Sequence, residues 1–278
     1  MIQYPLGVNG VTTRVLDSGG QGDLLVMLHG VGSRADRFRF NVDGLGKAGY
    51  RAVAVDLPGH GLADKGALRY SVGYYASFVI DLIDSLGADR AGIIGTSLGG
   101  HIGAQAALTA PGRITSLVMV GTMGVVPLGQ DTAKAIARSI LDRSKAGIAG
   151  KLRFVLHRHD LITDAWIEEE FKINNSPGTD EAFQRLSTYF AEQVDDDVVG
   201  ERLLDVSGQI PMLLVWGADD EMIKADVGHA AQRVLKDTPL VLLSGTGHVP
   251  YLERPDDFNA LIVDFLHGRI AASSTQTI

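Results

Sequence analysis

Cysteine is absent from this 278-residue chain, and so are clusters of basic residues and long uncharged apolar runs. Without cysteine there can be no disulfide, no thiolate nucleophile and no cysteine metal ligand. No apolar run reaches the roughly 20 residues that a membrane-spanning helix needs, and the N-terminus lacks a basic segment followed by an apolar one. We therefore expect a cytoplasmic protein with no membrane partner.

The charge of the chain points away from nucleic acids as well. The formal net charge is -8, and hydrophobic residues make up 45% of the chain, which is typical of an acidic globular protein. Binding to nucleic acid requires a concentrated basic face, which scattered lysines and arginines do not provide. The expected partner is a small-molecule substrate, with no metal and no cofactor, and the sequence leaves the oligomeric state open.

Short apolar runs, each ending in a glycine-rich or polar loop, recur along most of the chain. Continuous apolar runs predict strands buried on both faces. Helical patterns separate them, so the predicted fold class is α/β with a mostly parallel, doubly wound sheet. The helical patterns cover residues 71–86, 99–110, 226–235 and 255–266, and residues 3–17 predict a hairpin turning at Asn9-Gly10.

Between residues 124 and 208 the strand signals stop. Amphipathic helical patterns replace them at residues 131–142, 151–158, 164–174 and 180–193. An insertion of this kind predicts a helical cap over the carboxyl ends of the strands, where such sheets bind ligands. The expected division is a core of residues 1–123 and 209–268, a cap of residues 124–208 and a flexible tail of residues 269–278.

The segment Gly95-Thr96-Ser97-Leu98-Gly99 follows the apolar run AGIIG and opens an alanine-rich helical pattern. A Gly-x-Ser-x-Gly sequence between a strand and a helix is typical of a nucleophile elbow. In so sharp a turn, side chains two residues on either side of the serine must be nearly absent. The alternative is a glycine-rich turn with an incidental serine, but the strand and helix around it favour Ser97 as a catalytic nucleophile.

A serine hydroxyl needs a base within hydrogen-bond reach. His248 follows the last apolar run, which places it after both the serine and a candidate acid, in the chain order typical of this motif. The acid that orients the imidazole is expected where the run PMLLVWGADD ends. Asp219 and Asp220 both lie there, and the pattern alone leaves both open.

Hydrolysis through serine generates an oxyanion, which two backbone N–H groups must stabilise. Leu98 follows the nucleophile and should supply one of them. The loop after LLVML, in the sequence HGVG, should supply the other from Val31, because the flanking glycines allow a close backbone approach. A tight strand-to-helix turn is the simpler explanation of HGVG.

Together these motifs resemble the α/β-hydrolase family from about Leu24 to Leu266. The stretches HDLITDAWIEEEF, WGADD and GTGHVPYLERPDDFNALIVDFL look like the meta-cleavage-product hydrolases, which cleave C–C bonds in ring-fission products of aromatic degradation. The resemblance implies a core with a helical cap and a Ser-Asp-His triad. In those enzymes the acid follows Trp-Gly after two intervening residues, which selects Asp220.

The chain departs from that subgroup where the substrate should bind. The resemblance implies a cap arginine that holds a dienol carboxylate, but an ungapped comparison places Glu170 there. It also implies tryptophan after the catalytic histidine, where this chain has Val249. Glu170, its neighbour Phe171 and Val249 are therefore the candidate substrate-binding residues. Glutamate would repel an anionic substrate, unless a cap arginine compensates from Arg153, Arg158 or Arg185.

The leading prediction is a serine hydrolase that cleaves a carboxylic ester of a small hydrophobic or aromatic molecule through an acyl-enzyme on Ser97. The alternative is a C–C bond hydrolase of a meta-cleavage-type dienol acid. A third hypothesis is a small-molecule receptor or a cofactor-free oxygenase, because one fold hosts several functions.

Overall fold

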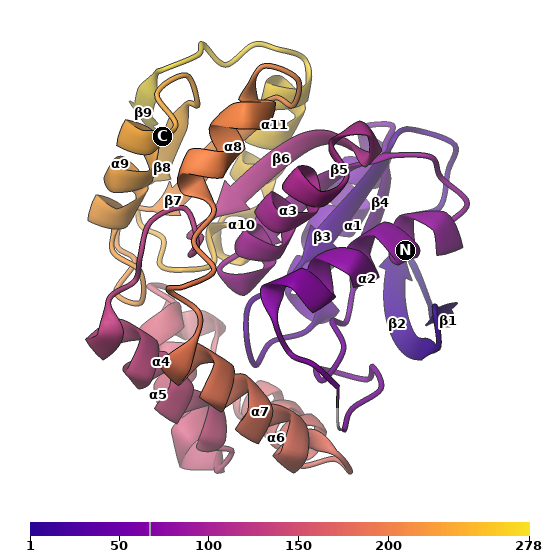
Figure 1. Ribbon diagram of the computed structural model, residues 1–278. Coiled ribbons are helices and arrows are strands. Elements are labelled where there is room, and N and C mark those ends of the chain that lie inside the picture. Colours follow the sequence, from indigo (N-terminus) through magenta and orange to yellow (C-terminus); the bar gives the residue numbers. More distant parts are fainter. Residues whose placement is uncertain (67) are drawn as a thin grey trace.

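The computed structural model describes residues 1–66 and 68–278 (Figure 1). They form a nine-stranded sheet in which only the first two pairings, β1 with β2 and β2 with β4, are antiparallel. The strand order is β1 (Ile2–Val8), β2 (Val11–Asp17), β4 (Arg51–Val55), β3 (Leu24–Leu28), β5 (Ala91–Thr96), β6 (Ile114–Val120), β7 (Met212–Gly217), β8 (Leu240–Leu243) and β9 (Thr275–Thr277). The predicted fold class is confirmed.

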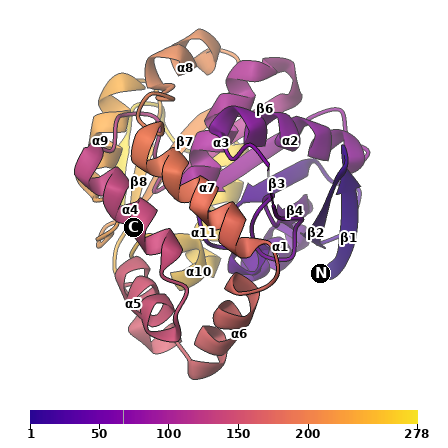
Figure 2. The same ribbon diagram turned by 60° about the horizontal axis from the view of Figure 1, so that its bottom comes forward.

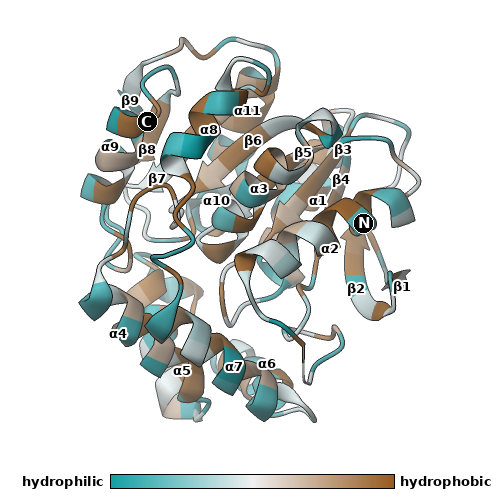
Figure 3. Ribbon diagram, viewed as in Figure 1, coloured by the Kyte–Doolittle hydropathy of each residue, from teal (hydrophilic) through white to brown (hydrophobic). Residues whose placement is uncertain are grey.

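The central strands are buried on both faces, which explains their continuous apolar runs. In β3, Val26 and Leu28 point into one apolar core, while Leu25 and Met27 point into the other. Successive side chains in a strand alternate between faces, so each run serves two helical layers. Coloured by hydropathy, the strands are mostly brown and the surrounding helices carry teal on their outer sides (Figure 3).

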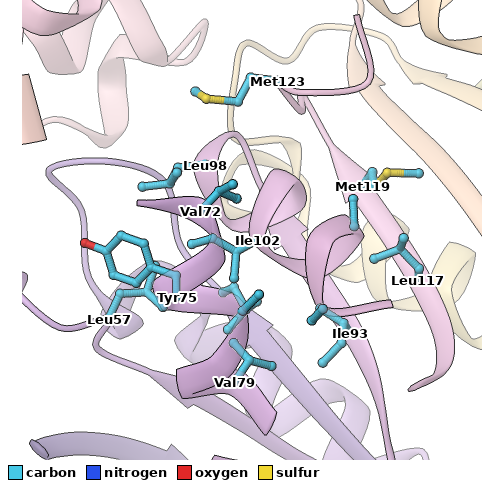
Figure 4. Close-up of a cluster of buried hydrophobic side chains, with 14 of the residues drawn as sticks. Leu57, Val72, Tyr75, Val79, Ile93, Leu98, Ile102, Leu117, Met119 and Met123 are labelled. Atoms are coloured by element: carbon cyan, nitrogen blue, oxygen red, sulfur yellow. The ribbon is translucent and has the colours of Figure 1, made fainter. Parts of the chain in front are cut away.

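One face of the sheet is covered by α2 (Val72–Ser85), α3 (Leu98–Thr109), α8 (Gly200–Ser207) and α9 (Ala225–Val234), the other by α1 (Arg39–Lys47), α10 (Pro250–Glu253) and α11 (Pro255–Leu266). Short 3-10 turns occupy Ala35–Phe38, Pro111–Arg113 and His159–Leu161. Figure 4 shows Leu98 and Ile102 of α3 in the same buried cluster as Ile93 of β5. This packing fixes the turn between β5 and α3, which contains Ser97.

Between β6 and β7 the chain forms four further helices, here called the cap helices, before α8 returns it to the sheet. They are α4 (Gln130–Leu141), α5 (Lys145–Val155), α6 (Asp164–Asn174) and α7 (Thr179–Glu192). They gather at one end of the molecule, beyond the carboxyl ends of the strands (Figures 1 and 2). Helices α4 and α7 pack together, as do α5 and α6. Helices α4, α6 and α7 coincide with predicted helical patterns, whereas α5 begins six residues before its predicted pattern of 151–158 and ends at Val155. The division of the chain into core and cap domains stays a prediction.

Two features differ from the sequence-based expectations. The patterns do not predict α1, whose sequence RFNVDGLGK contains two glycines; Val42 and Leu45, both fully buried, hold it against the sheet. The tail is not wholly flexible either, because Thr275–Thr277 forms β9 and pairs with β8. Without it, β8 would expose an unpaired row of backbone N–H and C=O groups.

No helix within the described part of the chain is both long and apolar enough to cross a lipid bilayer.

Candidate active site

Ser97 lies in a strained turn between β5 and α3. Its backbone φ and ψ are 55° and -117°, a region that residues other than glycine rarely adopt. The neighbouring glycines make the turn possible. A Cβ at position 95 would lie 2.2 Å from the Gly99 carbonyl oxygen, and one at position 99 would lie 2.2 Å from the Leu28 carbonyl oxygen. The Gly-x-Ser-x-Gly pattern therefore has a steric cause.

His248 lies between β8 and α10, and its ring is anchored on one side. Its Nδ1 lies 2.7 Å from Oδ2 of Asp220, and all but 4% of each residue is buried. Since a carboxylate only accepts hydrogen bonds, Nδ1 carries the proton and Nε2 keeps a free lone pair. Within residues 1–66 and 68–278, this buried Nε2 has no hydrogen-bond partner. The ring therefore presents a base.

Of the two candidate acids, the structure places Asp220 and not Asp219 beside His248. The second oxygen of Asp220 accepts the backbone N–H groups of Met222 and Ile223, at 2.8 and 2.9 Å. These bonds fix the carboxylate so that its other oxygen faces the imidazole. Asp219 is exposed, and it accepts the Gly245 N–H at 3.1 Å.

The HGVG loop runs directly past the serine. A Cβ on Gly30 would lie 3.2 Å from Cβ of Ser97. His29 holds this loop, since its Nε2 accepts the Leu57 N–H and its Nδ1 therefore donates to the Gly30 carbonyl, at 2.9 and 2.8 Å. Across the described residues, neither the Val31 N–H nor the Leu98 N–H donates to another protein group. Both donors remain available for an oxyanion.

The surroundings of three other buried histidines indicate structural roles. Burial lowers the pKa of His29 to about 4 and that of His60 to about 3, so both rings are neutral near pH 7. Their ring centroids are 5.1 Å apart. His101 in α3 contacts the Asp197 carbonyl through Nε2, at 2.8 Å. None of the three lines the cavity that contains Ser97.

Ser97 and His248 line one cavity of about 60 Å³ between the sheet and the cap. Its apolar wall comes from α4 and α5, through Ile136, Ile140, Leu152 and Val155. The α4 residues belong to one apolar core of the protein, whereas Leu152 belongs to the other. The cavity therefore lies where the two cores meet above the nucleophile elbow. Val31 and Val249 also line it.

Two cationic side chains, Arg37 and Lys151, line the same cavity. Arg37 pairs with Glu170, and its guanidinium lies 4.1 Å from the ring centroid of Trp166. Lys151 has no such partner: no carboxylate in the described part of the chain pairs with its Nζ, which lies 3.4 Å from the Gly32 carbonyl oxygen. Burial lowers the pKa of Lys151.

Glu170 and Phe171 do not line this cavity. Glu170 is buried on α6, forms ion pairs with Arg34 (3.1 Å) and Arg37, and accepts from Trp166 Nε1 at 3.2 Å. Burial opposes its ionisation, but Arg37, Arg34 and Lys151 nevertheless hold the pKa of Glu170 below its ordinary value. Its negative charge is thus neutralised within the protein and does not face the cavity.

The cap arginines that could compensate for Glu170 lie elsewhere. Arg158 pairs with Asp160 and Arg185 pairs with Glu181, both on the surface, and Arg153 is exposed. None of the three lines the cavity. The positive charge at the site comes instead from Arg37, in the core, and from Lys151.

A wider groove of about 990 Å³ adjoins the cavity between α4, α5 and the start of α9. Four residues line both spaces: Ile136, Ser139, Lys151 and Met222. Apolar side chains, including the half-exposed Phe154, share the groove with four carboxylates, those of Asp131, Asp142, Glu221 and Asp226. Lys151 therefore marks the boundary between the enclosed cavity and the open groove.

A family model described as the alpha/beta hydrolase family matches residues 25–261. The chain belongs to the alpha/beta hydrolase family. This α/β hydrolase is therefore an enzyme of the serine-hydrolase class, and both the predicted family and the predicted class are confirmed.

Among curated relatives, this α/β hydrolase is 30% identical over 261 residues to a 2-hydroxy-6-oxononadienedioate/2-hydroxy-6-oxononatrienedioate hydrolase of Paraburkholderia phymatum, covering 90% of this chain and 89% of the relative. It is 27% identical over 263 residues to the dihydrolipoyllysine-residue acetyltransferase component of an acetoin cleaving system in Cupriavidus necator, covering 94% of this chain and 68% of that protein. A meta-cleavage product hydrolase from Pseudomonas fluorescens superposes with a TM-score of 0.83 at 22% identity, over 96% of this chain and 98% of that one. That likeness supports the fold.

Sequence reasoning on this α/β hydrolase misses Lys151, Arg37 and Glu253. Glu253 in α10 accepts the N–H of Gly247 and of Arg158, each at 2.7 Å, and so ties the loop of the base to the cap. Burial raises its pKa. One signal for Lys151 is visible in the sequence, because it lies at helical spacing with Ile148, Leu152 and Val155, as a cation on an apolar face.

Proposed function

We propose that this α/β hydrolase cleaves a C–C bond next to a ketone in an acidic dienol substrate, through nucleophilic attack by Ser97. The observation that carries the proposal is the cavity in which Ser97 and His248 face the same space as two cations: Arg37, which pairs with Glu170, and Lys151, with which no carboxylate of the described residues pairs. A cation in that space favours an anionic substrate. The curated relative from Paraburkholderia phymatum is named as a hydrolase of such a dienedioate.

In this mechanism the base is His248. The dienol first ketonises: its hydroxyl proton moves to the carbon beside the existing ketone, and the new carbonyl can then delocalise the electron pair that C–C cleavage releases. Nε2 of His248 takes the proton from Ser97 Oγ while Oγ forms a bond to the carbonyl carbon. Asp220 stabilises the imidazolium through Nδ1. The N–H groups of Val31 and Leu98 bind the oxyanion.

Collapse of this intermediate breaks the C–C bond. The electron pair moves to the departing carbon, which takes the proton from the imidazolium. Water then hydrolyses the acyl-enzyme on Ser97 to give a second acid. Because the departing carbon needs a proton at the right moment, His248 serves as base in the first half and as acid in the second.

The second candidate is carboxylic ester hydrolysis by the same residues. The apolar cavity wall favours it, since Ile136, Ile140, Leu152 and Val155 suit a neutral acyl group. Val249 beside the base also adds an apolar surface. In this reaction the departing group is an alkoxide, which needs less stabilisation than a carbanion.

The deciding experiment compares purified protein and its Ser97→Ala variant on a ring-fission dienol acid and on p-nitrophenyl, aryl and alkyl esters. Cleavage of the dienol acid with a kcat/KM above that for every ester, lost in the variant, is the expected result. Ester cleavage alone would establish the second candidate. If no substrate turns over and a fluorophosphonate leaves Ser97 unlabelled, the third hypothesis, a small-molecule receptor or a cofactor-free oxygenase, is favoured.

A further inference from the structure

Lys151 is the cation of the active site that the rest of the protein leaves unpaired. Arg37 is neutralised by Glu170, whereas no carboxylate pairs with Lys151 in the described residues. An ammonium that is half-buried without a carboxylate partner loses part of its hydration, and a single long hydrogen bond to the Gly32 carbonyl replaces only part of what is lost. A partly buried cation without a carboxylate partner is typical of a site that binds an anionic ligand.

The position of Lys151 along the cavity can be bounded from two glycines of one loop. Position 30 approaches Ser97, where a Cβ would lie 3.2 Å from the serine Cβ, and position 32 approaches Lys151, where a Cβ would lie 3.0 Å from Nζ. Two residues span at most about 7 Å. Since both side chains also line the same small cavity, one substrate molecule can contact the ammonium and the nucleophile together.

The volumes indicate which part of the substrate reaches Lys151. The cavity of about 60 Å³ is small, because sites that enclose a whole ligand of moderate size measure roughly 300–1,000 Å³. The rest of the substrate must extend into the groove of about 990 Å³. A group that extends from one space into the other passes the residues that line both, and Lys151 is the only charged one among them.

We infer that Lys151 is a specificity-determining residue that binds a carboxylate on the arm of the substrate that runs from the reacting carbonyl toward the groove. The preferred substrate is therefore an acyl compound with a distal acid, whichever bond is cleaved. This inference rests on the proposed function of Ser97. The lowered pKa of Lys151, caused by burial, agrees with a cation that lacks a partner until substrate binds.

The test uses two pairs of substrates that differ only in the distal acid. One pair is a p-nitrophenyl hemi-ester of adipic acid and its methyl-capped diester, and the other is a dienol diacid and the dienol acid without the second carboxylate. The ratio of kcat/KM within a pair is the readout. A charge-assisted hydrogen bond predicts a preference of about ten- to hundredfold for the free acid.

Three variants assign that preference to one side chain. Lys151→Met should reduce the ratio to near unity, and Lys151→Arg should restore most of it. Lys134→Met is the matched control, because it removes an exposed lysine from α4 that lines neither space. A ratio unchanged in Lys151→Met, or reduced equally in Lys134→Met, would overturn the inference.

A binding measurement separates this inference from the proposed function. Calorimetry with the Ser97→Ala protein measures the affinity for adipate with and without Lys151→Met. We expect adipate binding to weaken at least tenfold in the double variant. If Ser97→Ala abolishes turnover but Lys151→Met does not weaken adipate binding, only the role of Lys151 is refuted. If turnover survives Ser97→Ala, the proposed function itself is refuted.

Discussion

Glu170 offers a sharp test, because the sequence comparison and the structure assign it different roles. The comparison puts it where a substrate-binding cation is expected, so its removal should improve the binding of acids and leave stability unchanged. The structure instead buries it between Arg34 and Arg37. We therefore expect Glu170→Ala to destabilise the fold.

The magnitude follows from burial. Removing one partner of a buried ion pair leaves charge without compensation and costs about 3–5 kcal/mol. Unfolding entropy is about 2.1 cal/mol/K per residue, so for 278 residues the melting temperature should fall by about 5–9 °C. Glu169 is the matched control, since it also pairs with Arg34 but its side chain is 58% exposed. Glu169→Ala should cost at most about 1 kcal/mol.

Denaturant unfolding of the three proteins at pH 7, followed by circular dichroism, measures these differences. A double variant, Glu170→Met with Arg37→Met, should recover part of the loss, because it removes the unpaired charge as well. Equal effects of Glu169→Ala and Glu170→Ala, or a loss below about 1 kcal/mol in Glu170→Ala, would refute the reasoning.

Three further predictions follow from the geometry around the base and from the buried histidines. Asp220→Asn should lower kcat by about 10³–10⁴-fold by favouring the wrong imidazole tautomer; Asp219→Asn should change it less than threefold, and similar losses in both would contradict the assignment of the acid. Glu253→Gln should cost about 1–3 kcal/mol of unfolding free energy, because an amide cannot accept both N–H groups, and its kcat should fall with KM nearly unchanged; wild-type stability would remove Glu253 as a positioning residue. The folded-state pKa values of His29 and His60, about 4 and 3, lie below the ordinary value of 6.5. Their stabilisation is therefore complete above pH 6.5 and is lost as pH falls toward 4, by about 1.4 kcal/mol per pH unit for each ring. Unfolding measured between pH 5.5 and 4.5 should show a slope smaller by that amount in His60→Asn, and an unchanged slope would show that His60 takes no part.

The sheet could be predicted because its signal is local. An apolar run of five residues can satisfy both faces of a central strand, so β3, β5 and β7 are visible without their neighbours. Elements held mainly by packing are not visible in this way. Helix α1 has weak intrinsic propensity and is held by Val42 and Leu45, and β9 exists because β8 offers it an edge.

The residues of the candidate site also divide into those visible in a local sequence pattern and those decided by tertiary packing. Ser97 and its glycines form a short sequence whose steric requirements are complete in five residues. The identity of the acid is not settled by the residue pattern alone. Asp219 and Asp220 are adjacent; the family resemblance selects Asp220, and the physical cause is the turn that aims its carboxylate at His248. That distinction depends on backbone N–H groups of residues that follow the strand.

The sequence by itself determined the fold class, the chain order of the catalytic serine, acid and histidine, and the presence of a nucleophile elbow. Each of these is read from short motifs whose residues lie close together in the chain. Tertiary structure alone decided the charge of the cavity. Glu170 and Arg37 are 133 positions apart, and their pairing cancels a charge that a comparison of positions would assign to the substrate. Lys151 lines the same cavity as Ser97 only because α5 folds back over the strand ends. Electrostatic interactions depend on distance in space and on burial, and neither can be read from position in the chain.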